Sequence, residues 1–130
     1  MNKQQKAYSV AEIKLKAAEA VLKAREKSFL KLRGRPESCL YEIDDDQTFD
    51  ALLIEFYEDP EIVNMADDIE AHRTALNTAE DELIEYALSI APAGLRETLR
   101  RGAATRATIR KELIQATMKL DTETVPKVIV

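Results

Sequence analysis

A seven-residue repeat between Ile62 and Ile90 is the feature of this chain that most restricts its fold. Apolar residues recur at every seventh position, and a second series follows three positions after the first four of them. The two series are Ile62, Ile69, Leu76, Leu83 and Ile90, and then Met65, His72, Ala79 and Tyr86. Alternating steps of three and four place both series on one face of an α-helix. The repeat therefore predicts a helix from about residue 60 to residue 90 with one apolar seam, roughly 45 Å long at 1.5 Å per residue.

Another long helix is predicted near the start of the chain. It begins at Ser9, because Ser9-Val10-Ala11-Glu12 follows the capping-box pattern, and it ends at Gly34, which precedes Arg35-Pro36. A wide apolar arc runs along this segment, so we expect two neighbours to cover it. Four alanines would let a partner helix approach closely: Ala17, Ala18, Ala20 and Ala24.

A last long helix is predicted after the break at Ala91-Pro92-Ala93-Gly94. Gly102 and Arg106 weaken the middle of its apolar seam, and they mark a place where the helix bends or meets something other than a plain apolar face. The seam residues are Leu95, Leu99, Gly102, Ile109, Leu113, Ala116 and Leu120.

Between the first two long helices the sequence predicts a connection and a short helix. Residues 35–47 form the connection, and an Asp or Thr among residues 46–48 caps the short helix. The apolar face of this helix is Phe49, Leu52, Leu53, Phe56 and Tyr57. Asp59-Pro60-Glu61 then marks the start of the seam helix, since Asp caps a helix and Pro suits its first position.

These segments together predict an all-α fold. We expect three long helices in a coiled-coil-like antiparallel bundle, one short accessory helix and an extended C-terminal tail. We also expect one helical domain over residues 1–130, with an ordered core at about 9–120 and tails at 1–8 and 121–130. A hydrophobic fraction of 45% and a charged fraction of 33% are typical of a globular protein.

Charge is sorted into three blocks along the chain. Residues 1–36 hold ten Lys or Arg against three Glu, residues 37–85 hold seventeen acids against Arg73 alone, and residues 86–130 hold eight bases against four acids. The net charge of −5 therefore hides basic segments on either side of an acidic one. Such blocks can attract each other within the fold or remain available to a partner.

Two groups of charged residues are the candidate partner-binding residues. The bases of the last helix fall within an arc of roughly 140° at about 100° per residue. Acids flank the seam of the 60–90 helix and gather before the short helix, and opposite charges would select how helices pair. The candidates are Arg96, Arg100, Arg106, Arg110, Lys111, Asp44, Asp45, Asp46, Asp67 and Asp68.

No pattern in the sequence predicts a catalytic, metal or cofactor site. His72 lies four residues after Asp68, which would suit a metal or an acid–base pair, but a packed seam residue explains it better. Asp44, Asp46, Thr48, Asp50 and Glu55 match five positions of a calcium loop, although Phe49 occupies the position that requires Gly. The single cysteine, Cys39, excludes a disulfide within the chain.

The sequence favours a non-enzymatic protein–protein interaction or assembly module, such as an inhibitor or accessory factor, acting through charged helical faces. The partner would be a protein, and homo-oligomers are compatible with the seams. Two alternatives stay open: a nucleic-acid-binding protein that uses the first and last helices, and an acidic mimic of nucleic acid that uses Asp44 to Glu85. No apolar run approaches the ~20 residues of a membrane span, so we expect no membrane partner and a cytoplasmic location.

Overall fold

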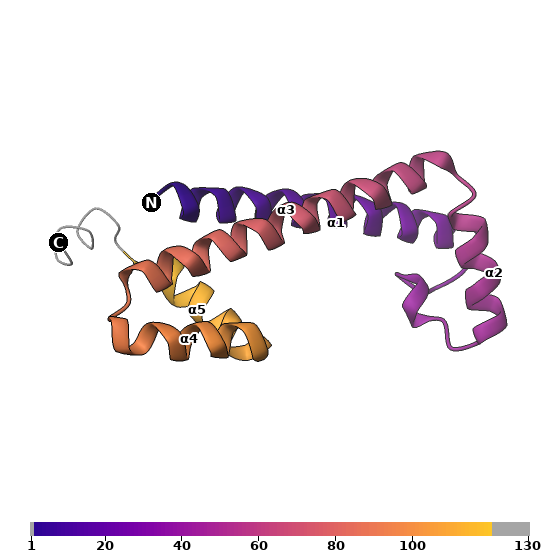
Figure 1. Ribbon diagram of the computed structural model, residues 1–130. Coiled ribbons are helices and arrows are strands. Elements are labelled where there is room, and N and C mark those ends of the chain that lie inside the picture. Colours follow the sequence, from indigo (N-terminus) through magenta and orange to yellow (C-terminus); the bar gives the residue numbers. More distant parts are fainter. Residues whose placement is uncertain (1, 121–130) are drawn as a thin grey trace. The chain divides into compact units, whose positions relative to one another are not determined.

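Every regular element in residues 2–120, the part of the chain that the computed structural model describes, is a helix (Figure 1). Side chains of residues 104 and 105 are not described. The predicted all-α class is therefore confirmed for this part, and the predicted tail at 121–130 lies outside it. None of the helices in this part combines the length and apolar character needed to cross a membrane. The elements are α1 Lys3–Leu32, η1 Leu40–Glu42, α2 Asp46–Phe56, α3 Pro60–Ile90, α4 Ala93–Thr105 and α5 Ala107–Met118.

Helix α1 begins six residues earlier than the Ser9 pattern predicts. The side chain of Asn2 accepts a hydrogen bond from the backbone N–H of Gln5 at 2.8 Å, and the side chain of Gln5 accepts one from the backbone N–H of Asn2 at 2.9 Å. This reciprocal pair is a capping box in which Asn and Gln replace Ser and Glu. The predicted start at Ser9 is wrong, and residues 3–8 are helical rather than a tail.

The other predicted helix boundaries follow local chemistry closely. Helix α1 ends at Leu32, and Gly34 adopts a φ of +69°, which glycine tolerates without strain. Its N–H bonds the carbonyl of Lys31, and the N–H of Arg35 bonds the carbonyl of Leu30, as in a Schellman motif. Helix α3 begins at Pro60, as predicted, and Asp59 accepts the N–H of Glu61.

The last predicted helix is two helices. Arg106 has extended backbone angles, with φ −132° and ψ 112°, and it ends α4 and precedes α5. The chain turns here close to Gly102, where an added Cβ would lie 3.2 Å from Cγ2 of Ile109. The missing side chain of Gly102 thus lets α5 pack back against α4. A continuous helix from 95 to 120 is wrong, although the break falls where Gly102 and Arg106 interrupt the seam.

The described chain divides into two compact units. The central unit is Ile13–Arg73, and the terminal unit is Met1–Glu12 with Thr74–Val130. The division falls within α1 and within α3. The prediction of a single domain remains a prediction.

The core of the central unit joins α1, η1, α2 and α3. Leu30 lies at its centre, and the rings of Phe29 and Phe56 meet edge to face with centroids 5.1 Å apart. Such aromatic pairs add to the stabilisation that burial alone provides. The buried members are Leu30, Leu40, Ile43, Phe56 and Ile62.

The core of the terminal unit joins the start of α1 to the end of α3, α4 and α5. Leu83 is 0% exposed, and Tyr8 packs against the same cluster. Gln5 is also 0% exposed, and its Nε2 donates to the carbonyls of Thr117 at 2.8 Å and Leu120 at 3.1 Å. The buried members of the cluster are Leu83, Ile84, Leu88, Ala103 and Ile114.

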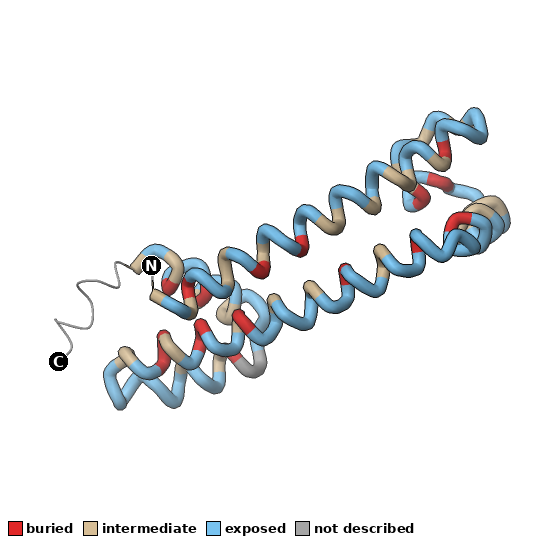
Figure 2. The backbone as a smooth tube through the Cα atoms, turned by 90° about the horizontal axis from the view of Figure 1, so that it is seen from above, coloured by how far each residue is buried: buried red, intermediate tan, exposed pale blue. Residues whose placement is uncertain are grey.

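The predicted α3 seam is buried along much of its length. Buried positions recur at intervals along the helices in Figure 2, and on α3 they include Ile62, Ile69 and Leu83. Leu76 and Ile90 are partly exposed. Within residues 2–120 only α1 and α3, with 30 and 31 residues, are long, so the predicted bundle of three long helices is not confirmed.

Candidate functional site

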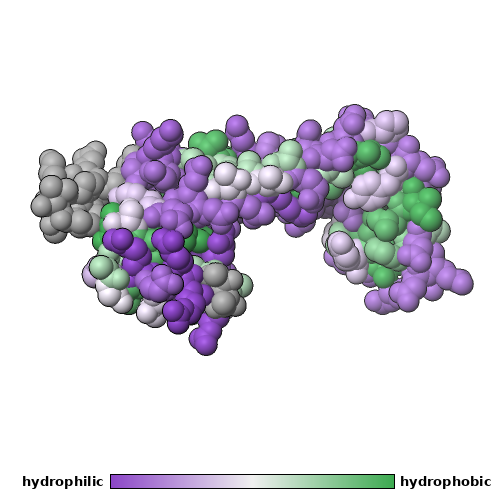
Figure 3. Space-filling model, viewed as in Figure 1, coloured by the Kyte–Doolittle hydropathy of each residue, from purple (hydrophilic) through white to green (hydrophobic). Residues whose placement is uncertain are grey.

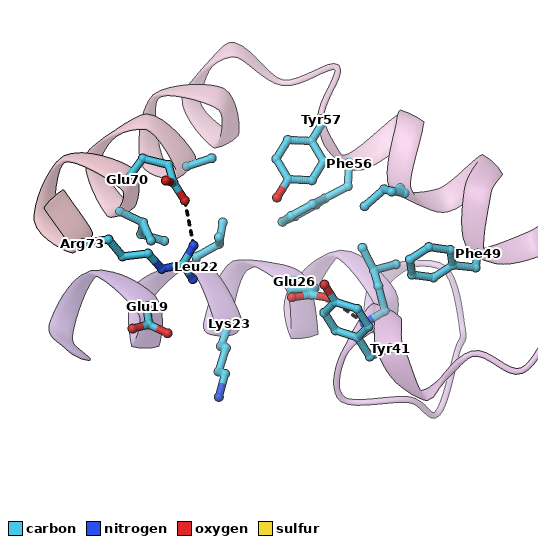
Figure 4. A pocket seen from close by; sticks show the side chains of 14 residues that line it. Glu19, Leu22, Lys23, Glu26, Tyr41, Phe49, Phe56, Tyr57, Glu70 and Arg73 are labelled. Atoms are coloured by element: carbon cyan, nitrogen blue, oxygen red, sulfur yellow. Dashed lines mark hydrogen bonds and ion pairs between the residues drawn. The ribbon is translucent and has the colours of Figure 1, made fainter. Parts of the chain in front are cut away.

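A groove on the central unit is a candidate binding site. It has a volume of about 370 Å³ and is bounded by α1, η1, α2 and α3. Figure 4 shows its side chains converging from these elements, with Leu22 on α1 and Phe56 on α2. Among its apolar lining residues, Leu22, Phe49 and Leu53 are only partly buried, so a ligand in the groove could contact them.

The floor of the groove is apolar and anchored. Phe56 is buried and belongs to the core of the unit, while Leu22 and Leu53 pack against that core and remain partly exposed. Ile69 of the α3 seam also lines the groove. A floor tied to the core keeps its shape without a ligand, which lowers the cost of binding.

Two tyrosines stand beside this floor. Tyr41 in η1 is 89% exposed, and its ring centroid lies 6.1 Å from that of Phe49. Tyr57 meets Phe56 edge to face at 5.4 Å. Burial, with the carboxylate of Glu26 second, raises the pKa of the Tyr57 hydroxyl, so both the ring and its O–H are available near neutral pH. Exposed tyrosines of this kind are enriched at the centres of protein interfaces.

The rim of the groove carries both signs of charge. Glu26 accepts the backbone N–H of Leu40 at 2.6 Å and so holds η1 against α1. Arg73 and Glu70 form an ion pair at 2.7 Å within α3. Glu19 and Lys23 of α1 are the other charged residues that line the groove. Because the charges nearly balance, apolar and aromatic contacts would dominate recognition.

Apolar surface around α2 is extensive for so small a unit. Figure 3 shows apolar side chains gathered there among hydrophilic ones. Ile54 on α2 and Leu32 at the end of α1 are both largely exposed. Contiguous exposed apolar surface on a small protein marks interaction sites.

The arginines predicted for partner binding belong to the terminal unit, where two of them are paired. Arg100 lies 3.6 Å from Glu85, and Arg110 lies 3.4 Å from Glu80 and 2.5 Å from Asp81. The hydrogen bond to Asp81 is the main cause that raises the pKa of Arg110. Their partners Glu80, Asp81 and Glu85 lie near the end of α3, because α4 and α5 fold back on that part of the helix.

The remaining bases of this group have different surroundings. Arg96 donates to the carbonyl of Ala91 at 3.3 Å, and Arg106 is exposed at the break between α4 and α5. Lys111 lines a second pocket of about 350 Å³. The structure therefore does not gather the five bases into one site.

That second pocket is polar. Its walls include Tyr8, Glu12, Glu80 and Arg110 as well as Lys111. The Tyr8 hydroxyl donates to Glu12 at 2.9 Å, and burial, with that contact second, raises the pKa of Tyr8 to about 12. The pocket is lined by two acids and two bases, which suits a small polar ligand better than a polyanion.

The predicted acids belong to the central unit. Asp45 caps α2 by accepting the N–H of Thr48 at 3.0 Å, so the cap is one residue before the predicted range. Asp44 and Asp46 are exposed beside it, and Asp67 and Asp68 are exposed on α3.

The structure does not support the metal patterns. Residues from Asp46 to Phe56 are helical, so most residues of the calcium pattern lie in a helix and cannot form a calcium-binding loop. His72 is partly buried and Asp68 is exposed. Among residues 2–120, no group of three or more His, Cys, Asp or Glu side chains could hold a metal ion.

Sequence reasoning missed the groove. Leu53 and Phe56 were expected on the apolar face of the short helix, yet the groove that they line with Leu22 depends on how α2 packs against the other helices. Tyr41 was one indication of the groove in the sequence. It is an aromatic residue within a polar connection, where it has no evident role in the local structure.

Comparison of the chain with models of known protein families, with curated proteins and with solved structures found no match.

Proposed function

We propose that this chain is a non-enzymatic protein–protein interaction or assembly module that binds a partner protein through the groove of the central unit. The observation that carries this proposal is the anchored apolar floor beside Tyr41, which is 89% exposed. A partner side chain of apolar or aromatic character would fill the groove, and the tyrosines would close over it. An inhibitor or accessory factor would use such a surface, and a cytoplasmic location without a membrane partner belongs to the same proposal.

The groove is a better candidate for the partner-binding surface than the charged helical faces are. Its floor can be desolvated at little cost, whereas each exposed charge pair contributes only about 0–1 kcal/mol. A few buried aromatic anchors usually carry most of the binding free energy of an interface.

The test is affinity capture from native lysate with the wild type and a Tyr41→Ala/Tyr57→Ala variant. A protein that the wild type retains and this variant loses would support the proposal. The matched control is Leu95→Ala, which truncates an exposed apolar residue of the terminal unit. Equal capture by all three proteins would contradict binding through the groove.

The nucleic-acid alternatives are tested by the same capture at low and high salt with a nuclease-treated arm. Binding through Arg96, Arg100, Arg106, Arg110 and Lys111 would give nucleic acid that is lost at high salt. A mimic using the acids between Asp44 and Glu85 would instead retain nucleic-acid-binding proteins. Arg100 and Arg110 pair with acids of α3. This pairing favours neither alternative, because it uses bases that nucleic-acid binding would need and acids that a nucleic-acid mimic would need.

A further inference from the structure

Helix α1 carries a second apolar face that no described residue covers. Ile13 is 64% exposed and Val21 is 52% exposed, although both belong to an ordered helix. Ala17, Ala20 and Ala24 are exposed between and beyond them. At about 100° per residue these five side chains fall within an arc of roughly 100°. Leu22 and Leu30, which pack on the core, lie on the other side of the helix.

The spacing of this outer face is that of a helix-pairing seam. Ile13, Ala17, Ala20 and Ala24 follow steps of four, three and four, as in the a and d positions of a coiled coil. Alanines let two helix backbones approach closely, whereas helices that lie on membranes present bulky Trp, Phe and Leu. The face therefore suits another helix.

Lysines on both sides of this face favour a partner helix with acidic residues. Lys14 lies on one side and Lys27 on the other, and both are exposed. Two α1 outer faces would place lysines against lysines, which is unfavourable. An acidic helix with small residues along its ridge is the complementary partner.

Helix α3 of the central unit carries an exposed acidic face. Val63 is 41% exposed, and Asn64 and Ala71 are exposed on the side of α3 away from its buried seam. Asp67 and Asp68 are exposed on either side of Ala71. Asp67 lies between Val63 and Ala71 on the helix surface, so this exposed face is acidic and complements the lysines beside the outer face of α1.

The two faces cannot meet within one copy. In the central unit, α1 and α3 share a core through Leu22, Leu30, Ile62 and Met65, on the opposite sides of the two helices. Each copy therefore presents both halves of a complementary pair outward.

We propose that the outer face of α1 binds the outer face of α3 of a second copy of this chain. Different patches meet in this contact, so in a bound pair one copy keeps a free α3 face and the other keeps a free α1 face. The assembly then grows beyond a dimer unless it closes into a ring. This contact uses neither Tyr41 nor Tyr57, so it can fail without affecting the groove.

Sedimentation velocity over a range of protein concentrations tests this contact. The average mass of the wild type should rise with concentration and fall when salt is added. Lys14→Glu/Lys27→Glu and Asp67→Lys/Asp68→Lys should each weaken association at least about tenfold, because like charges then face each other. A mixture of the two variants should associate again, since each reversed face meets a reversed complement.

The control is Lys3→Glu/Lys119→Glu, which makes the same charge change on exposed lysines of the terminal unit. It should associate as the wild type does, and circular dichroism should show equal helix content in all variants. A monomeric wild type at every concentration would overturn the proposal. Wild-type association that survives both reversals, or a mixture that stays monomeric, would also overturn it.

Discussion

The side chain of Gln5 holds two helix ends together in the terminal unit. Its oxygen caps the start of α1, and its nitrogen donates to two carbonyls at the end of α5. Because Gln5 is 0% exposed, water cannot replace these bonds when the amide is removed. One amide therefore satisfies backbone groups that both helices would otherwise leave unpaired.

We predict that Gln5→Ala lowers the free energy of unfolding by about 1–3 kcal/mol, the usual cost of leaving buried polar groups unsatisfied. Urea unfolding followed by circular dichroism measures this change. Gln115→Ala is the control, because Gln115 is exposed on α5 and should change stability by less than about 0.5 kcal/mol. Equal effects of the two substitutions would show that the Gln5 bonds contribute nothing.

Tyr8 should make the stability of the chain depend on alkaline pH. Its pKa is about 12 in the fold, and that of an unfolded tyrosine is about 10, so the folded state keeps the proton longer. The stability from the neutral hydroxyl is complete below pH about 10 and is lost as pH rises through about 12. The stability difference between the wild type and Tyr8→Phe should be constant from about pH 7 to 9 and fall above about pH 10. Urea midpoints at each pH measure it, and a constant difference to about pH 11 would contradict the burial of Tyr8.

At the level of helices, the break between α4 and α5 depends on a close approach. Gly102 lets Ile109 lie where a Cβ would be only 3.2 Å from Cγ2 and 3.3 Å from Cδ1. Alanine favours a helix over glycine by about 1 kcal/mol, whereas overpacking costs about 1–3 kcal/mol. The steric cost should therefore exceed the gain in helix propensity.

We predict that Gly102→Ala lowers the free energy of unfolding by about 0.5–2 kcal/mol. In the background of Ile109→Ala, which removes the opposing side chain, the same substitution should be neutral or stabilising. Denaturant unfolding of the four proteins in this double-mutant cycle measures the coupling. A stabilising effect of Gly102→Ala alone would show that Ile109 moves aside without cost.

Helix boundaries differ in how far sequence can predict them. Gly34 and Asp59-Pro60 act through their own backbone and neighbours, so the end of α1 and the start of α3 were predicted correctly. The start of α1 was not, because Asn2 and Ser9 both begin acceptable capping boxes. Contacts of Gln5 with Thr117, far along the chain, favour the earlier one. Such distant contacts also place the groove and the fold-back of α5.

At the level of the whole chain, the three charge blocks pair within each unit. In the central unit, Arg25 of the first block lies 3.2 Å from Glu61 of the acidic block, and Arg33 pairs with Glu55 and stacks on the ring of Phe29. In the terminal unit, bases of the last block pair with α3 acids. The sorting of charge in the sequence is thus explained in part by attraction inside the fold. It could not be predicted which bases remain available, since that depends on how the helices pack.

This pairing predicts a specific sensitivity to acid. Hydrogen bonds from Arg33 and Arg25 hold the pKa values of Glu55 and Glu61 below their usual range. A carboxylate with a lowered pKa contributes stability above its unfolded pKa, near pH 4, and loses it as pH falls through the folded value. Arg25→Gln/Arg33→Gln should therefore lose less stability than the wild type between about pH 7 and 3.

Urea unfolding at both pH values gives this difference. The variant should be less stable than the wild type at neutral pH, and the two should converge in acid, because the protonated glutamates no longer attract either arginine. Lys111→Gln/Lys119→Gln is the control for the change in net charge, and it should keep the acid dependence of the wild type. If the arginine variant kept that dependence as well, the attraction between the first two charge blocks would not contribute to stability. The separation of basic and acidic blocks along the chain would then have to be explained by binding to a partner.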